Sequence, residues 1–256
     1  MIPADDRGLT LGDGLFETVL AKDGALVDWD AHLSRLAQGC TVLGLPPPDE
    51  AGALRLAQAA LASAGLDQAR AAVRVTLTAG SGGRGLDRPT PLRPRMFATA
   101  APATPPAGPA RLTTSAVRRN ADSPVSRLKT LAYLDNVLAR AEAQAAGADE
   151  AVMLNTRGEL ACASAANLFW IREGRLETPD LVCGVLAGVM RARVLAAAAE
   201  LGVPAAEVRA SESVLKQAEA VFLTNSLIGV REAASWNGRS FAPSALVARL
   251  AARAEP

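Results

Sequence analysis

The stretch that most constrains the fold is APATPPAGPA (101–110), ten residues without charge near the middle of a 256-residue chain. Proline lacks a backbone N–H and has a fixed φ, so such a stretch favours an extended connection over a helix or an inner strand. Segments with strand and helix character alternate on both sides of it. We therefore expect a smaller N-terminal domain over 1–105, a linker over 101–112 and a larger C-terminal domain over 113–256.

Both halves mix strands with helices. The segment 71–78 (AAVRVTLT) alternates as a half-buried strand does, leucines recur at helical spacing after Asp30, and a second helix is expected from Asp49. Further strands are expected at 15–20, 25–28, 96–100, 111–117, 150–154, 165–171, 175–177 and 218–224, and further helices at 131–146, 188–201 and 244–254. The pattern predicts an α/β or α+β protein with a mixed sheet in each half.

The charge balance and the aromatic content disfavour nucleic acid as a partner. Lys and Arg number 27 against 26 Asp and Glu, which gives a net charge of +1, and only 4% of the residues are aromatic. A sequence-independent nucleic-acid binder needs a basic excess to neutralise phosphates, and a single-strand binder needs aromatic rings for stacking.

Histidine and cysteine usage narrows the chemistry further. His32 is the single histidine, so a zinc site built on several histidines cannot form within one chain. The three cysteines, Cys40, Cys162 and Cys183, match no CxxC pattern, and their odd number does not suggest a disulfide framework. The N-terminus does not resemble a secretory signal and no apolar run is long enough to span a bilayer, so we expect a cytoplasmic protein without membrane contact.

A glycine-rich segment follows the expected strand 71–78. GSGGRG (80–85) could bind phosphate through backbone amides, but it lacks the GK[ST] ending of a P-loop. A mobile loop over a substrate is the preferred interpretation. Arg84 within it carries a planar guanidinium that suits a substrate carboxylate.

Three other segments could carry chemistry, although each alone also fits an ordinary structural role. Lys129 lies among leucines in SRLKTLAYL, where partial loss of hydration lowers an amine pKa and favours imine formation. The amides of Val189 and Met190 open an expected helix, and LTNSLIG (223–229) follows an expected strand, so both could bind phosphate. Together these features are what a pyridoxal phosphate enzyme acting on amino acids requires.

The chain resembles the class IV aminotransferases, which are pyridoxal phosphate enzymes of fold type IV. The resemblance implies a smaller N-terminal α+β domain, a larger C-terminal α/β domain and the cofactor between them, near the interface of a homodimer. The matching motifs occur in the family's order over nearly the whole chain: DRGLTLGDGLFET (6–18), HLSRL (32–36), LKTLAYL (128–134), SAANLF (164–169), AGVMR (187–191) and LTNSLIGV (223–230).

Carried over by this resemblance, Lys129 is the catalytic lysine that forms the imine with the cofactor and moves the substrate's α-proton. Arg35 would hold the cofactor phosphate together with the amides of Val189 and Met190 and the hydroxyl of Ser226. Tyr133 is expected at the cofactor's phenolic oxygen. His32 belongs to the same motif as Arg35, and we expect it to have a structural role.

The chain departs from the family in three places. Cys162 stands five residues before Asn167, where the family usually has the glutamate that faces the pyridine nitrogen. Glu159 could replace it only through a register shift, which in a regular strand would turn its side chain to the other face. Ala132 stands where asparagine is common, and the strand that usually precedes DRG is expected to be short or missing.

Among class IV enzymes the chain most resembles 4-amino-4-deoxychorismate lyase, which releases pyruvate from 4-amino-4-deoxychorismate and leaves 4-aminobenzoate for folate synthesis. The substrate is amino-acid-like and carries carboxylates, for which Arg84 is the candidate. An aminotransferase of D-amino acids or branched-chain amino acids is the alternative, and a non-catalytic relative that binds pyridoxal phosphate is a third. A neutral thiol at position 162 weakens the electron sink, which favours the lyase because aromatisation also drives that reaction.

Overall fold

The computed structural model describes residues 2–255, which form two compact units. One unit runs up to Pro105 and also contains Leu128–Ala132; the other consists of Pro106–Arg127 and the chain from Tyr133 onward. The short segment around Lys129 therefore belongs to the first unit, although it follows the Pro/Ala stretch in the sequence. Among the described residues, none of the helices has the length and apolar character needed to cross a bilayer.

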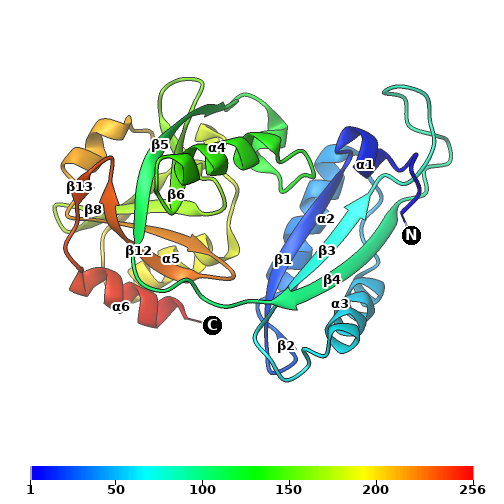
Figure 1. The fold of residues 1–256 in the computed structure, drawn as a ribbon, viewed down its shortest axis with the longest axis horizontal. Coiled ribbons are helices and arrows are strands. Elements are labelled where there is room, and N and C mark those ends of the chain that lie inside the picture. The colour runs from blue at the N-terminus through cyan, green and yellow to red at the C-terminus, as the bar shows by residue number, and fades with distance from the viewer. Residues whose placement is uncertain (1, 256) are drawn as a thin grey trace. The chain divides into compact units, whose positions relative to one another are not determined.

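The first unit has a four-stranded antiparallel sheet in the order β2-β1-β3-β4 (Figure 1). The strands are β1 (Gly14–Lys22), β2 (Ala25–Leu26), β3 (Ala71–Thr78) and β4 (Arg95–Pro102). The expectation of a mixed sheet in this half was wrong. A parallel pair needs a crossover connection, usually a helix, and the residues between β3 and β4 form none.

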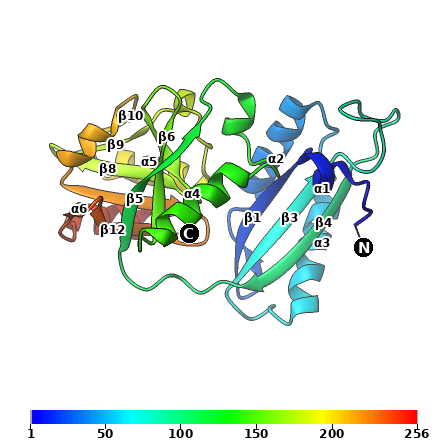
Figure 2. The same ribbon diagram turned by 45° about the horizontal axis from the view of Figure 1, so that its top comes forward.

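Helices α2 (Trp29–Leu43) and α3 (Glu50–Ala64) cover one face of this sheet (Figure 2). Leu15, Leu77, Leu33 and Leu36 pack together there with other apolar side chains. Helix α2 begins earlier than expected because Asp28, in the left-handed region with φ 53°, is its N-cap, and Asp30 lies within its first turn.

A short helix, α1 (Arg7–Leu11), was not predicted, because five residues are too few to show a helical repeat of apolar positions. Arg7 is buried, and its guanidinium donates to Asp13 and to the backbone carbonyls of Leu86 and Asp87. The glycine-rich segment is therefore tied to α1. Arg84 itself is exposed, and the mobility of the segment stays a prediction.

The second unit has a nine-stranded mixed sheet whose main path runs β10-β9-β8-β11-β12-β5-β6-β7, with β13 paired to β12. The pairs β5–β6, β5–β12 and β9–β10 are parallel, and the others are antiparallel. The strands are β5 (Ala110–Arg119), β6 (Glu150–Asn155), β7 (Leu160–Ala163), β8 (Asn167–Arg172), β9 (Arg175–Pro179), β10 (Ala205–Val208), β11 (Ala220–Asn225), β12 (Gly229–Trp236) and β13 (Arg239–Ser240).

Three α-helices and three short 3-10 helices complete this unit: α4 (Leu134–Ala145), α5 (Val189–Glu200), α6 (Ala245–Ala254), η1 (Pro124–Arg127), η2 (Leu181–Cys183) and η3 (Glu212–Lys216). Helices α5 and α6 pack on one another and on β8 and β11, where Phe169 and Phe222 stack with ring centroids 5.0 Å apart. Trp170, Leu168 and Leu223 belong to a separate apolar core. The strands of this core at β8 and β11 were predicted from the sequence. Strands β10 and β12 were missed because most of their residues are only partly buried and their apolar and polar residues do not alternate.

Candidate active site

Lys129 is held beside the first strand of the first unit. The amide of Phe16 donates to the Lys129 carbonyl at 2.9 Å, and the amide of Leu131 donates to the Gly14 carbonyl at 3.0 Å. An added Cβ at Gly14 would lie 2.4 Å from the Leu77 carbonyl oxygen, so glycine is needed for this close packing. The LKT segment therefore has a fixed position against β1.

The Lys129 amine lies in a half-buried position over an aromatic ring. Its Nζ is 4.3 Å from the centre of the Phe16 ring, and the Arg74 guanidinium lies 3.6 Å from the same centre. Burial lowers the Lys129 pKa to about 8, the nearby Glu17 carboxylate partly opposes this shift, and the charges of Arg35 and Arg74 reinforce it. An amine with this pKa is substantially neutral at mildly alkaline pH and can act as a nucleophile or a base.

The buried carboxylate of Glu17 interacts electrostatically with Lys129 and forms hydrogen bonds with Arg35. Glu17 is 2% exposed, and its Oε1 and Oε2 accept from Nε and Nη2 of Arg35 at 2.8 and 2.6 Å. His32 Nδ1 lies 2.7 Å from Glu17 Oε2. Burial raises the pKa of Glu17, but the bonds from Arg35 and His32 outweigh burial and hold it below the ordinary range. Glu17 is therefore a fixed negative charge held by Arg35 and His32.

In the second unit, the start of α5 lies beside the start of β8. Asn167 Nδ2 donates to the Leu186 carbonyl at 2.9 Å, and an added Cβ at Gly188 would lie 2.0 Å from Asn167 Oδ1. Gly188 is the N-cap of α5 and forms no side-chain cap. The first-turn amides of Val189 and Met190 therefore have no capping side chain, which is the arrangement that binds anions at a helix N-terminus.

The turn that carries Ser226 lies at the same end of the sheet. Thr224 is the register partner of Asn167, and Asn225 Oδ1 accepts from the amides of Leu227 and Ile228 at 2.9 Å each. The Thr224 hydroxyl is buried and has no hydrogen-bond partner among the described residues. A buried hydroxyl without a partner is costly, so a polar ligand here would satisfy it. These groups suit a phosphate.

Cys162 lies next to a β-bulge in β7. Met153 pairs with Cys162 and Leu154 with Leu160, so Ala161 is an extra residue. Cys162 packs on the same side as Ala161, against α4, and burial raises its thiol pKa. The residue at this position is therefore a neutral thiol.

Glu159 lies on the same side of the chain as Cys162 because of the bulge, so the alternation argument against it does not apply. Its Oε2 is 3.6 Å from Cys183 Sγ, which belongs to the apolar cluster of Cys162. However, Asn155, Arg157 and Arg209 all donate to its carboxylate and hold its pKa at about 2. Glu159 is thus engaged in a polar cluster of its own.

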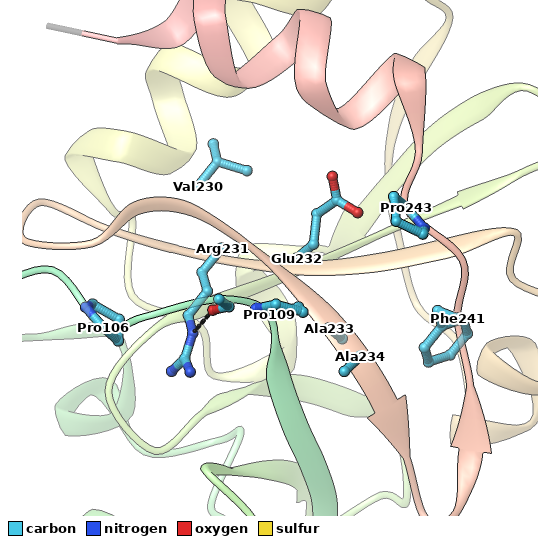
Figure 3. A pocket seen from close by; sticks show the side chains of 10 residues that line it. Pro106, Pro109, Val230, Arg231, Glu232, Ala233, Ala234, Phe241 and Pro243 are labelled. Carbon is cyan, nitrogen blue, oxygen red and sulfur yellow. Dashed lines mark hydrogen bonds between the residues drawn. The ribbon is translucent and has the colours of Figure 1, made fainter.

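Two predicted residues remain, Arg84 in the first unit and Tyr133 in the second. Arg84 is exposed. Its backbone forms an isolated antiparallel β-bridge with Asp87, close to the carbonyls that Arg7 contacts. Tyr133 is the N-cap of α4 and is half-buried. A cavity of about 410 Å³ in the second unit is lined by none of the predicted site residues (Figure 3). Its lining includes Pro109, Arg231 and Phe241.

Sequence reasoning missed Glu17 and Arg74. Both lie in strand segments, where a single charge among apolar residues is usually taken as a solvent-facing position. The sequence did contain one indication. Residues at alternate positions of a strand share a face, so Glu17 is expected on the same face as the apolar Leu15 and Val19.

Comparison with known proteins shows the family of this chain. Residues 14–236 match the family described as amino-transferase class IV. An aminodeoxychorismate lyase of Vibrio harveyi is 31% identical over 234 residues, covering 90% of this chain and 85% of the relative. A Methanocaldococcus jannaschii protein, provisionally named a branched-chain-amino-acid aminotransferase, is also 31% identical, covering 86% of this chain and 77% of the relative.

A solved structure agrees with the sequence comparison. The crystal structure of 4-amino-4-deoxychorismate lyase from Pseudomonas aeruginosa superposes with a TM-score of 0.87 at 33% identity and covers 98% of this chain and 93% of that one. The fold and the family expected from the motifs are confirmed. The chain belongs to the class IV aminotransferase family of pyridoxal phosphate-dependent enzymes and has its fold-type IV architecture.

Proposed function

We propose that this enzyme is an aminodeoxychorismate lyase, which eliminates pyruvate from 4-amino-4-deoxychorismate and leaves 4-aminobenzoate for folate synthesis. The observation that carries the proposal is the half-buried Lys129 amine with a pKa near 8 beside Glu17 and Arg35. The similarity to lyases from Vibrio harveyi and Pseudomonas aeruginosa over nearly the whole chain supports it.

The residues present fit pyridoxal phosphate as the cofactor. Lys129 offers an amine suited to imine formation, and Arg35 a guanidinium for the phosphate. The uncapped α5 amides of Val189 and Met190, and Ser226 in the turn beyond the partnerless Thr224 hydroxyl, offer further phosphate donors. We also propose that Tyr133 and Cys162 contact the cofactor ring.

When bound, the cofactor stabilises negative charge at the substrate's α-carbon. The protein's own part is to move a proton and to hold the substrate. Lys129 would take the α-proton on Nζ, for which its lowered pKa is suited. Arg84 is proposed to bind a substrate carboxylate. Because the neighbouring Leu86 carbonyl is held by Arg7, less conformational entropy would be lost when the substrate binds.

Cys162 favours the lyase over an aminotransferase. A thiol that burial keeps neutral cannot supply the negative charge that stabilises a protonated pyridine nitrogen. The electron sink is then weaker. In the lyase reaction the formation of an aromatic ring provides additional driving force, so this reaction tolerates a weaker sink better than transamination does.

The test is an assay of the purified enzyme with enzymatically prepared 4-amino-4-deoxychorismate, in parallel with D- and L-amino acids and 2-oxoglutarate or pyruvate as amino acceptor. Release of pyruvate and 4-aminobenzoate supports the lyase. Borohydride reduction followed by peptide mapping should find the cofactor on Lys129. Transamination without lyase activity would refute the proposal.

The second candidate is an aminotransferase of branched-chain or D-amino acids. The observation that favours it is the 31% identity to the Methanocaldococcus jannaschii relative over most of both chains. An aminotransferase must form the pyridoxamine state of the cofactor, whereas the lyase reaction does not require it. Accumulation of pyridoxamine phosphate in stopped-flow experiments with a single amino acid would therefore identify this activity.

We further propose that the protein is a homodimer in the cytoplasm. Helix α4 exposes a stripe of apolar side chains, Leu134, Val137 and Leu138, at 68%, 57% and 49% of their surfaces. Such a stripe is typical of a protein interface. All three cysteines are free thiols, as expected in a reducing compartment. Sedimentation at micromolar concentration tests the dimer.

A further inference from the structure

Glu17 occupies a position where an apolar side chain would ordinarily lie. It shares one face of β1 with Leu15 and Val19, and that face packs against α2. A buried carboxylate loses hydration, and replacing a buried ion pair by well-packed apolar residues is often neutral or stabilising. Packing alone therefore does not account for the charge at this position.

The carboxylate fixes one guanidinium in a single orientation. Nε and Nη2 of Arg35 donate to the two carboxylate oxygens of Glu17 at 2.8 and 2.6 Å, so each oxygen accepts one hydrogen bond from the guanidinium. His32, one helical turn before Arg35 on α2, contacts Oε2 at 2.7 Å from another side. A carboxylate held by three contacts from one helix face leaves the guanidinium plane little freedom to rotate.

The fixed orientation of the Arg35 guanidinium matters for the choice of anion. The positive charges of Arg35 and Arg74 both act on the Lys129 amine, and charge alone attracts any anion without selecting its shape. A phosphate monoester is distinguished from other anions by directed hydrogen bonds to its oxygens, and such bonds need donors that are already oriented.

We propose, on the basis of the proposed function, that Glu17 is a positioning residue. Its carboxylate holds the Arg35 guanidinium in the orientation that recognises the phosphate of pyridoxal phosphate, and it thereby determines how strongly the protein prefers this cofactor to phosphate-free pyridoxal. Glu17 itself does not contact the cofactor in this proposal.

The experiment measures the dissociation constants of pyridoxal phosphate and of pyridoxal on the same apoenzyme, by absorbance titration at fixed pH, and compares their ratio among variants. Glu17→Gln keeps the size of the side chain but replaces one acceptor oxygen by an amide nitrogen, which cannot accept a guanidinium bond. Glu177→Gln is the matched control, because Glu177 is also 2% exposed and accepts from an arginine, Arg172, and from a ring nitrogen, that of Trp170.

We expect Glu17→Gln to lower the preference for pyridoxal phosphate over pyridoxal by about tenfold or more, the value of one lost charge-assisted hydrogen bond. Glu177→Gln should leave the ratio unchanged, even if it lowers thermal stability. A general loss of structure at Glu17 would weaken both ligands equally, so an unchanged ratio in Glu17→Gln overturns the inference.

Glu17→Asp provides a second variant if Glu17→Gln does not fold. It keeps the charge but withdraws the carboxylate by one methylene group, which breaks the paired contact with Arg35. The ratio should again fall, and an unchanged ratio overturns the inference. Borohydride mapping of the wild type separates the two proposals. Absence of label on Lys129 overturns the proposed function and this inference with it, whereas an unchanged ratio on a labelled enzyme overturns the inference alone.

Discussion

Nη2 of Arg7 lies 2.9 Å from the backbone carbonyl oxygen of Leu86, across 79 residues of sequence. Arg7 also pairs with Asp13 at 2.9 Å, and Arg88 pairs with the same aspartate at 2.6 Å. The two arginines thus connect the residues that follow Arg84 to one carboxylate. If Arg84 binds substrate, its position depends on a contact made at the start of the chain.

We predict that Arg7→Lys destabilises the protein by about 2–4 kcal/mol, because a lysine cannot reproduce the forked contacts of a buried guanidinium. The loosened segment should also become sensitive to trypsin after Arg84. Urea unfolding and limited proteolysis measure the two effects. Arg55→Lys is the control, since the 3.5 Å pair of Arg55 with Asp49 is exposed and a change of less than about 0.5 kcal/mol is expected. Equal tryptic cleavage in both variants would contradict the prediction.

The second prediction concerns the pH dependence of Lys129 in the apoenzyme. Burial lowers its pKa to about 8, so the amine is mostly protonated and unreactive below this pH and mostly neutral above it. Trace labelling with acetic anhydride, followed by mass spectrometry, should show a reactivity that rises through pH 8 and levels off by about pH 9. Nα-acetyl-lysine, with a pKa of about 10.4, serves as the reference. A Lys129 profile that still rises at pH 10 would refute the lowered pKa.

The sequence indicates Lys129 as a candidate but does not indicate the side chains around it. The leucines around Lys129 and the order of the motifs are local features, and the fold followed from them. Glu17 makes its contacts with helix α2, Arg74 makes its contact across two strands, and Arg7 contacts Leu86 only after the chain has folded. The bulge at Ala161 could not be predicted either, because an extra residue in one strand depends on its pairing with β6.

Gly188→Ala tests the anion site at the start of α5. Gly188 has a φ of −72°, which alanine adopts easily, so the expected damage is steric: the new Cβ would lie 2.0 Å from Asn167 Oδ1. We expect a loss of stability of about 1–3 kcal/mol and weaker binding of pyridoxal phosphate. Gly238→Ala is the control, because Gly238 has open space around it and a φ of 82°. It should cost about 1 kcal/mol through backbone strain without changing cofactor affinity. Equal cofactor affinities in the two variants would exclude α5 from the phosphate site.

Cys162→Glu tests whether position 162 determines the reaction. A carboxylate facing the pyridine nitrogen would keep that nitrogen protonated and strengthen the electron sink, and transamination depends on the sink more than the lyase reaction does. We therefore expect the ratio of pyridoxamine formation from amino acids to 4-aminobenzoate release to rise by about tenfold or more, equivalent to ~1.4 kcal/mol of barrier difference. Cys162→Ser, which keeps a small neutral group, should leave this ratio near that of the wild type.

The new carboxylate of Cys162→Glu also adds a charge near Glu150, so thermal unfolding is measured for both variants and the rates are compared only on folded, cofactor-loaded enzyme. A constant ratio in folded Cys162→Glu would show that the thiol does not set the balance between the two reactions.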